Sequence, residues 1–266
     1  METGGKGTFK LVLEYDGTGF AGWQVQPGRR TVQGEMEKAL GGLAGEAVRV
    51  TAAGRTDAGV HATGQVVSFT MNWRHGARKL AAALNTVFPG DLAVVGAAEA
   101  AAGFDARRWA HSRKYRYTFL LRAVRSPLEE RRAWRLDPGL DVAAMRRACA
   151  LFRGRHNFTV FTTKAAAAGG AIRRITGSTL SREGERLHLE VTGEAFLHHM
   201  VRFMAAALAA VGQGRATVAD IRRALAGKGS APAAPAPARG LALVCVEYGP
   251  GRPRRDAAIT RPRVSY

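Results

Sequence analysis

Short runs in which every second residue is apolar constrain this chain most, because they predict half-buried strands. Four side chains in the first such run share one face: Phe9, Leu11, Leu13 and Tyr15. A second run repeats the pattern: Tyr115, Tyr117, Phe119 and Leu121. The same reasoning predicts further strands at 65–70, 172–180, 186–192 and 241–248.

Helical patterns lie between these runs without strict alternation of strand and helix. Thr31 and Asp141 each precede apolar residues at helical spacing, and Thr217 with Asp220 resembles a capping box. A longer apolar helix is predicted at about 196–211. The mixture predicts an α+β fold of two mixed, mostly antiparallel sheet lobes with flanking helices around a basic cleft.

Composition along the chain suggests its division into parts. We predict a flexible N-terminus at 1–8, an N-terminal lobe at 9–110, a C-terminal lobe at 111–249 and a basic tail at 250–266. The segment 231–238 has three prolines and predicts a semi-extended connector. No apolar run reaches the roughly 18 residues that span a bilayer, and the first ten residues lack an apolar signal core, so a cytoplasmic protein without a membrane partner is expected.

The charge balance favours a polyanionic partner. Forty Lys and Arg against 21 Asp and Glu leave a net charge of +19. Such an excess suits nucleic acid, through phosphate contacts and counterion release, although a solvated arginine-rich surface would give the same count. The two cysteines, Cys149 and Cys245, lie in apolar surroundings and form no disulfide framework, which fits a reducing compartment.

The run Gly54-Arg-Thr-Asp-Ala-Gly-Val-His61 is the strongest candidate for chemistry. A carboxylate between glycines after a strand predicts a tight turn at which backbone approaches a ligand. Asp57 in such a turn is a nucleophile, a base or only a turn-former, and Arg55 is placed to keep it ionised. His198 and His199 give no zinc signal, since adjacent helical residues point about 100° apart.

A set of motifs in order along the chain resembles the tRNA pseudouridine synthase A family. The set consists of Glu14-Tyr-Asp-Gly-Thr-Gly-Phe20, Gly22-Trp-Gln24, Thr31-Val-Gln-Gly34, the Asp57 run with Gly64-Gln-Val-Val67, Leu84-Asn85, Pro89-Gly-Asp91, Phe104-Asp-Ala-Arg107, Lys114-Tyr-Arg-Tyr117, Phe196-Leu-His-His-Met-Val-Arg202 and Gly240-Leu-Ala-Leu243. The resemblance covers roughly residues 9–248. It departs at Phe203, where the family usually has asparagine.

The resemblance implies a pseudouridine-synthase-like fold and a role for each candidate residue. Asp57 takes the place of the catalytic nucleophile, and Arg55 lies in the same active-site loop. Tyr115 corresponds to the residue that stacks on the target uracil, and Arg202 to the arginine that pairs with the catalytic carboxylate. No metal and no cofactor are expected, because no bond is oxidised and no group enters. Attack at the ribose C1′, addition to C6 of the base and a glycal route all stay open.

The resemblance also implies the substrate and the assembly. It predicts an isomerase that converts uridines 38, 39 and 40 in the anticodon stem-loop of tRNA, working as a homodimer. Two alternatives stay open: a non-catalytic RNA-binding protein that keeps the basic surface, and a pseudouridine synthase that acts on another RNA site.

Overall fold

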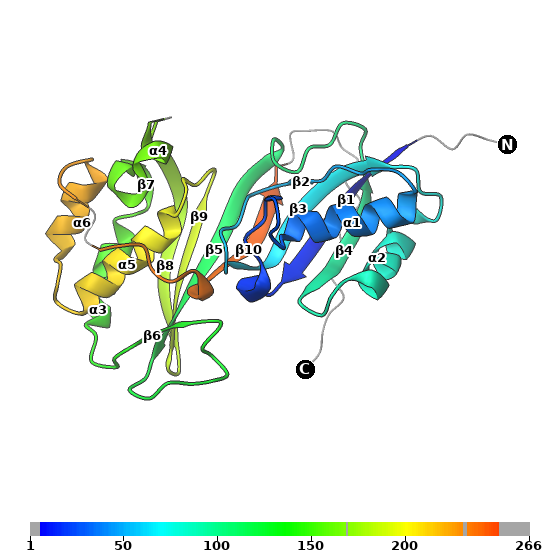
Figure 1. Ribbon diagram of the computed structural model, residues 1–266. Coiled ribbons are helices and arrows are strands. Elements are labelled where there is room, and N and C mark those ends of the chain that lie inside the picture. Colours follow the sequence, from blue (N-terminus) through cyan, green and yellow to red (C-terminus); the bar gives the residue numbers. More distant parts are fainter. Residues whose placement is uncertain (1–5, 169, 231–232, 250–266) are drawn as a thin grey trace. The chain divides into compact units, whose positions relative to one another are not determined.

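The computed structural model describes residues 6–168, 170–230 and 233–249 (Figure 1). Within it the chain forms two compact units. The first unit holds the described residues up to 111 together with 243–249, and the second holds those from 112 to 242. The second unit is therefore inserted between two segments of the first. The basic tail at 250–266 lies outside the described residues, and the predicted lobe limits stay a prediction.

The first unit is built on an antiparallel sheet. β1 (Gly7–Tyr15) lies between β4 (Leu92–Ala100) and β3 (His61–Met71) and is antiparallel to both. β10 (Leu241–Tyr248) is the neighbour of β3 on its other side, and the short β2 (Thr51–Ala52) also pairs with β3. The strands predicted at 9–15, 65–70 and 241–248 are confirmed.

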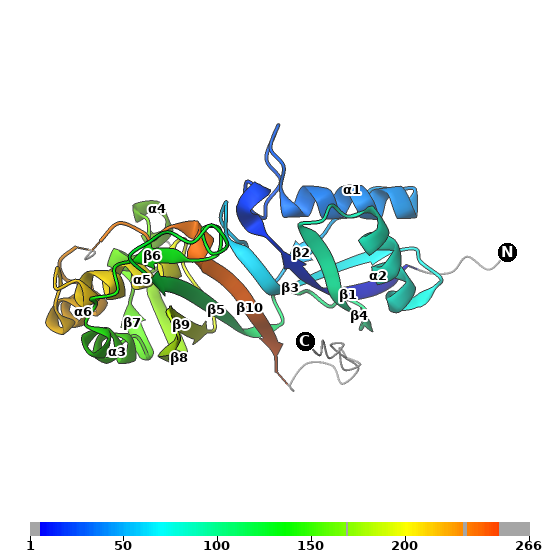
Figure 2. The same ribbon diagram turned by 90° about the horizontal axis from the view of Figure 1, so that it is seen from below.

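Two helices cover one face of this sheet, α1 (Val32–Ala44) and α2 (Gly76–Val87) (Figure 2). The hydroxyl of Thr31 accepts the N–H of Gly34, so the predicted helix cap is confirmed. The apolar side of β1 is buried, with Leu11 and Leu13 fully covered. Burial of such a strand face supplies much of the free energy of folding, because about 25 cal/mol is gained per Å² of apolar surface removed from water.

The second unit contains antiparallel strands in the order β5 (Ala110–Leu121), β9 (Arg186–Gly193), β8 (Ile172–Glu183) and β7 (Gly154–Asn157). The short β6 (Trp134–Leu136) runs parallel to the end of β5. Antiparallel pairs predominate in both units, and each unit also contains helices. The predicted α+β class with mostly antiparallel sheet is therefore confirmed.

Among its described residues the second unit contains the α-helices α3 (Val142–Ala150), α4 (Lys164–Ala167), α5 (Met200–Gly212) and α6 (Val218–Leu225). Asp141 caps α3, and Thr217 with Asp220 forms the predicted capping box of α6. α5 is buried along nearly its whole length, which its run of alanines allows because small side chains let neighbouring elements approach closely. None of the helices in the described ranges combines the length and apolarity needed to cross a membrane.

Candidate active site

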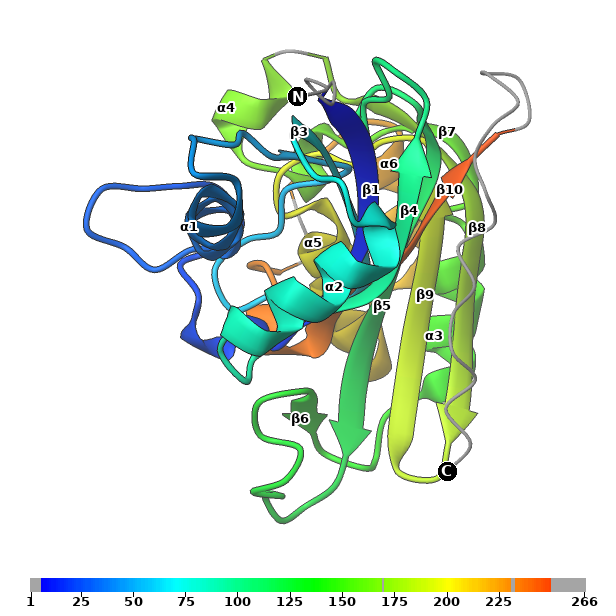
Figure 3. The ribbon, with the colours of Figure 1, turned by 90° about the vertical axis from the view of Figure 1, so that its right-hand side faces the viewer.

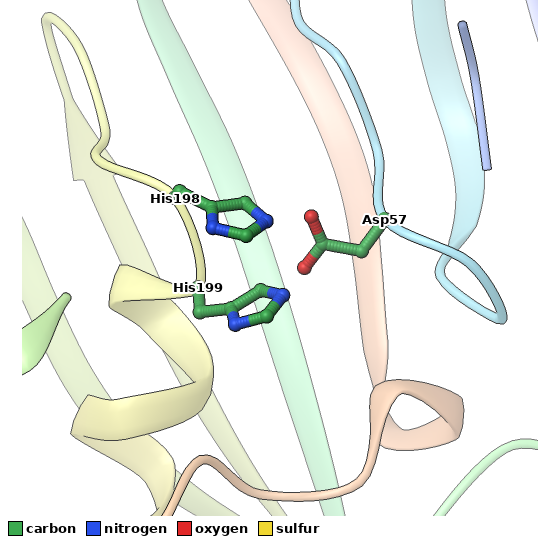
Figure 4. A group of neighbouring side chains, drawn as sticks. All are labelled: Asp57, His198 and His199. Atoms are coloured by element: carbon green, nitrogen blue, oxygen red, sulfur yellow. The ribbon is translucent and has the colours of Figure 1, made fainter. Parts of the chain in front are cut away.

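The predicted catalytic loop, residues 53–60, joins β2 to β3 in the first unit. Asp57 is half-buried there, and its carbonyl oxygen accepts the N–H of Val60 at 3.1 Å, which closes a tight turn. Gly59 has a φ of 76°, in the left-handed region that glycine enters without steric cost. Arg55 is exposed, and Figure 4 shows the Asp57 side chain leaving the loop.

Buried polar groups hold the first half of this loop. The Tyr15 hydroxyl lies 2.8 Å from the hydroxyl of Thr56, and the amide of Gln65 donates to the carbonyl oxygen of Gly54 at 2.6 Å. The N–H of Trp23 donates to the carbonyl oxygen of Thr56 at 2.9 Å. Burial raises the pKa of Tyr15 to about 12, so its hydroxyl keeps its proton at physiological pH. The backbone is thus fixed on both sides of the exposed arginine.

A close backbone contact holds the second half. The 3-10 turn Gly17–Gly19 lies so near the loop that a Cβ atom on Gly17 would be 2.0 Å from the carbonyl oxygen of Val60. The N–H of Gly17 donates to Nδ1 of His61 at 3.1 Å. The same Nδ1 lies 3.2 Å from Oδ1 of Asp16. These contacts join the start of β3 to the Gly17–Gly19 turn, so His61 helps to hold the loop.

Tyr115 lies on β5 in the second unit, on the same strand face as Tyr117 and Phe119. Its side chain is 8% exposed, and its ring packs on Phe196 with the centroids 5.0 Å apart and the planes at 77°. Two residues along, the Tyr117 hydroxyl donates to the carbonyl oxygen of Pro237 at 2.8 Å. Tyr115, the tyrosine predicted to stack on uracil, thus lies on a strand that is held in place by the hydrogen bond from Tyr117 to Pro237.

Arg202 lies in the first turn of α5 and is half-buried. Its Nε donates to the carbonyl oxygen of Ala236 at 2.7 Å, and the N–H of Ala236 donates back to the carbonyl oxygen of Arg202 at 3.1 Å. Ala236 is almost fully buried. This part of the predicted semi-extended connector is therefore fixed to the arginine, and it restrains the guanidinium.

The two neighbouring histidines differ from the sequence-based expectation. His199 has a φ of 61°, the one left-handed conformation among the described non-glycine residues, so α5 begins only at Met200 and not near Phe196. The rings of His198 and His199 stack with centroids 3.7 Å apart (Figure 4). The prediction that they point about 100° apart is wrong, so that argument against a metal does not hold. A reaction without a metal stays a prediction.

The structure distributes the four predicted site residues over both units. Arg55 and Asp57 share one loop of the first unit, whereas Tyr115 and Arg202 belong to the second. Sequence reasoning missed the residues that hold them: Gly17, Tyr15, Thr56, Gln65, Ala236 and Pro237. Of these residues, Gln65 could have been identified from the sequence, because an amide side chain inside an apolar strand needs a buried hydrogen-bond partner.

Comparison with known proteins agrees with the family resemblance of the sequence motifs. The family described as tRNA pseudouridine synthase matches residues 11–107 and 148–249. The chain is 44% identical to a tRNA pseudouridine synthase A of Citrifermentans bemidjiense over 241 residues, which are 90% of this chain and 96% of that protein. Identity to the protein of that name from Myxococcus xanthus is 42% over 253 residues, covering 94% and 96% of the two chains.

A further relative of the same name, from Moorella thermoacetica, is 42% identical over 242 residues, with 90% of this chain and 98% of that protein covered. The chain therefore belongs to the tRNA pseudouridine synthase family. The predicted resemblance is confirmed, and so is the enzyme class, an isomerase that modifies RNA.

Proposed function

We propose that this protein isomerises uridine to pseudouridine in the anticodon stem-loop of tRNA, at positions 38, 39 and 40. Asp57 is the nucleophile in this proposal. The observation that carries the proposal is the run Gly54–His61 around Asp57, in a chain whose alignment covers more than nine-tenths of the length of the relatives named as tRNA pseudouridine synthases. The net charge of +19 fits a polyphosphate substrate.

The proposed binding step brings the uridine out of its base stack, because the glycosidic bond cannot be reached inside a helix. Tyr115 offers an aromatic face to the extruded uracil. Base–aromatic stacking contributes about 1–3 kcal/mol per base, which holds a flipped base but does not by itself drive flipping. Arg202 supplies a positive charge, and the guanidinium is restrained by the hydrogen bond that its Nε donates to the carbonyl oxygen of Ala236.

The proposed chemical step exchanges one bond to the ribose for another. The C1′–N1 bond breaks and its electron pair stays on the uracil, which turns in place. C1′ then bonds to C5, the C5 proton leaves, and N1 takes up a proton. Asp57 assists as an ionised carboxylate, by attack at C1′, by addition to C6 or as a base toward a glycal. Arg55 lies in the same loop as Asp57 and is exposed. Because no group enters and nothing is oxidised, this isomerisation requires no cofactor.

Assembly and location belong to the proposal as well. The resemblance to the family supports a homodimer, and the composition supports a cytoplasmic enzyme. The relatives' printed names support tRNA as the substrate.

Loss of the C5 proton gives a direct test. Two transcripts of one tRNA are labelled with tritium at C5 of uridine, one with uridines at 38–40 and one with cytidines there. We expect the wild-type enzyme to release tritium from the first transcript only. Tritium release from both would identify another RNA site. Binding of both without any release would identify a non-catalytic RNA-binding protein.

Substitution of Tyr115 separates stacking from packing. Tyr115→Phe keeps the ring, and we expect an unchanged thermal midpoint and most of the turnover. Tyr115→Ala removes the ring that packs on Phe196, so it should lose turnover and also lower stability, by up to the roughly 3–5 kcal/mol typical of aromatic truncation in a core. Thermal unfolding and single-turnover rates, taken well below both midpoints, measure the two effects. If the Phe and Ala variants were equally inactive, the Tyr115 hydroxyl and not the ring would be what turnover requires.

A further inference from the structure

A small hairpin in the first unit projects from its surroundings. Seven consecutive residues, 24–30, are all exposed. Gln26 and Arg29 form an isolated antiparallel bridge, with Pro27 and Gly28 between them. Gly28 has a φ of 65°, so proline followed by glycine forms a tight turn of the kind that needs a left-handed third residue. Figure 3 shows this hairpin as the blue loop that extends past α1.

The base of the hairpin is fixed to the rest of the unit. Ala21 N–H donates to the carbonyl oxygen of Arg30 at 2.8 Å, and the Gln26 amide donates to the carbonyl oxygen of Ala21 at 2.8 Å. The guanidinium of Arg30 makes two hydrogen bonds to Asp91, at 2.7 and 2.8 Å, and lies 4.2 Å from the ring centre of Phe20. A bidentate pair of this kind holds one geometry, so the hairpin is presented in a defined direction.

The same base touches the backbone of the proposed nucleophile. A Cβ atom on Gly22 would lie 2.9 Å from the carbonyl oxygen of Thr56, 3.1 Å from the nitrogen of Ala58 and 3.2 Å from the carbonyl carbon of Asp57. Gln24 follows two residues later, at most about 7 Å along an extended chain. An RNA strand that delivers a uridine to Asp57 therefore passes close to the hairpin.

The exposed tip carries an apolar and a cationic side chain. Val25 is 47% exposed, although a valine adds little to stability at the surface, and Arg29 extends its positive charge into solvent. On the flanks of a flipped nucleotide an RNA strand offers phosphates, which bind arginine, and unstacked bases and riboses, which pack on apolar side chains.

We propose that the hairpin 24–29 is a second RNA contact of the enzyme, beside the target uridine. Arg29 pairs with a phosphate of the strand that enters the site, and Val25 packs against the nucleotide next to the target. The inference rests on the proposed function, in that it takes the strand bound at Asp57 to be RNA. A merely solvated turn is the competing reading, and it predicts no difference from other exposed positions of the unit.

Cross-linking tests the contact directly. Val25 is replaced by the photoreactive p-benzoylphenylalanine, and the matched control carries the same group at Val87, the last residue of α2, which is 56% exposed. On irradiation with tRNA we expect cross-links from position 25, mapped to nucleotides adjacent to the modified uridine, and only background from position 87. No cross-link at 25, or equal yields at both positions, would overturn the proposal.

Salt dependence tests the phosphate contact of Arg29. Each phosphate neutralised contributes about −0.7 to −0.9 to the slope of log affinity against log salt concentration. We expect Arg29→Ala to weaken tRNA binding and to reduce that slope in magnitude by roughly one. Arg78→Ala on the exposed side of α2 should leave both unchanged. Identical slopes for the two variants would contradict a phosphate contact at Arg29.

These measurements stay separate from the proposed reaction. Wild-type enzyme that releases no tritium from uridines 38–40 would refute the proposed substrate position. Cross-links from position 25 to nucleotides around another uridine would then still support the hairpin contact. Normal tritium release together with silent Val25 and Arg29 variants would refute the hairpin contact alone.

Discussion

Asp57→Asn should give a folded enzyme that binds tRNA and forms no pseudouridine. The amide matches the carboxylate in size, and the turn is closed by the backbone carbonyl oxygen of residue 57, which the substitution keeps. What is lost is the negative charge that attack or proton abstraction requires. We expect turnover to fall by on the order of a thousandfold or more, as removal of a nucleophile does. Tritium release measures turnover, and filter binding should show tRNA affinity within a few-fold of wild type.

Asp105→Asn is the matched control for that experiment. Asp105 is also a loop aspartate of the first unit, and its Oδ1 accepts the N–H groups of Arg107 and Arg108, each at 2.8 Å. It has no chemical role in the proposal, and an asparagine oxygen can accept the same hydrogens. Asp16 is less suitable, since it lies against His61. Substantial turnover in Asp57→Asn, similar to that of Asp105→Asn, would reduce Asp57 to a turn-former and refute the mechanism.

Gly17→Ala should cause the second-largest loss, although it changes no group that takes part in the chemistry. The new methyl carbon would lie 2.0 Å from the Val60 carbonyl oxygen and 2.5 Å from its carbon, both backbone atoms that cannot turn away. The loop that carries Asp57 must therefore shift. A displacement near 1 Å at a reacting group can cost about a hundredfold in rate. Overpacking of this kind also destabilises by about 1–3 kcal/mol, which calorimetry would record as a lower thermal midpoint.

Gly42→Ala provides the comparison within the same unit. Gly42 lies inside α1, and a Cβ there meets nothing within 4 Å. Alanine in a helix interior is favoured over glycine by roughly 0.5–1 kcal/mol, so this variant should be as stable as wild type or more so, with normal turnover. Wild-type turnover in Gly17→Ala would mean that the Gly17–Val60 contact does not set the position of the loop.

Local patterns predicted the parts of the fold that depend on neighbouring residues. The alternation from Phe9 to Tyr15 depends only on side-chain direction along one strand, and Asp141 as a helix cap depends on a partner three residues away. The predicted start of α5 was wrong, because it depends on a backbone conformation that the local pattern does not indicate. His199 takes a left-handed conformation that no nearby glycine announces, so periodicity extended the helix too far.

The same distinction applies to the candidate site. The motif containing Asp57 is contiguous and could be recognised, but its supports are remote in sequence. Tyr15 and Thr56 are 41 residues apart, and Arg202 and Ala236 are 34 apart. No spacing rule links such residues, because their contact is set by how strands and connectors pack. The candidate nucleophile could therefore be predicted from the sequence, but the contacts that hold its loop in place could not.

The return of β10 to the first unit has a consequence for how the protein is made. A Cβ on Gly64 of β3 would lie 2.1 Å from the Val244 carbonyl oxygen, so the two strands pack closely. β3 follows directly on the predicted catalytic loop. On the ribosome the inserted unit, residues 112–242, is complete before residues 243–248 emerge. At ~5–20 residues per second the first unit waits on the order of ten seconds for its last strand. Until then the loop that carries the proposed nucleophile lacks part of its sheet, so a nascent chain acquires this framework only after the whole inserted unit has been synthesised.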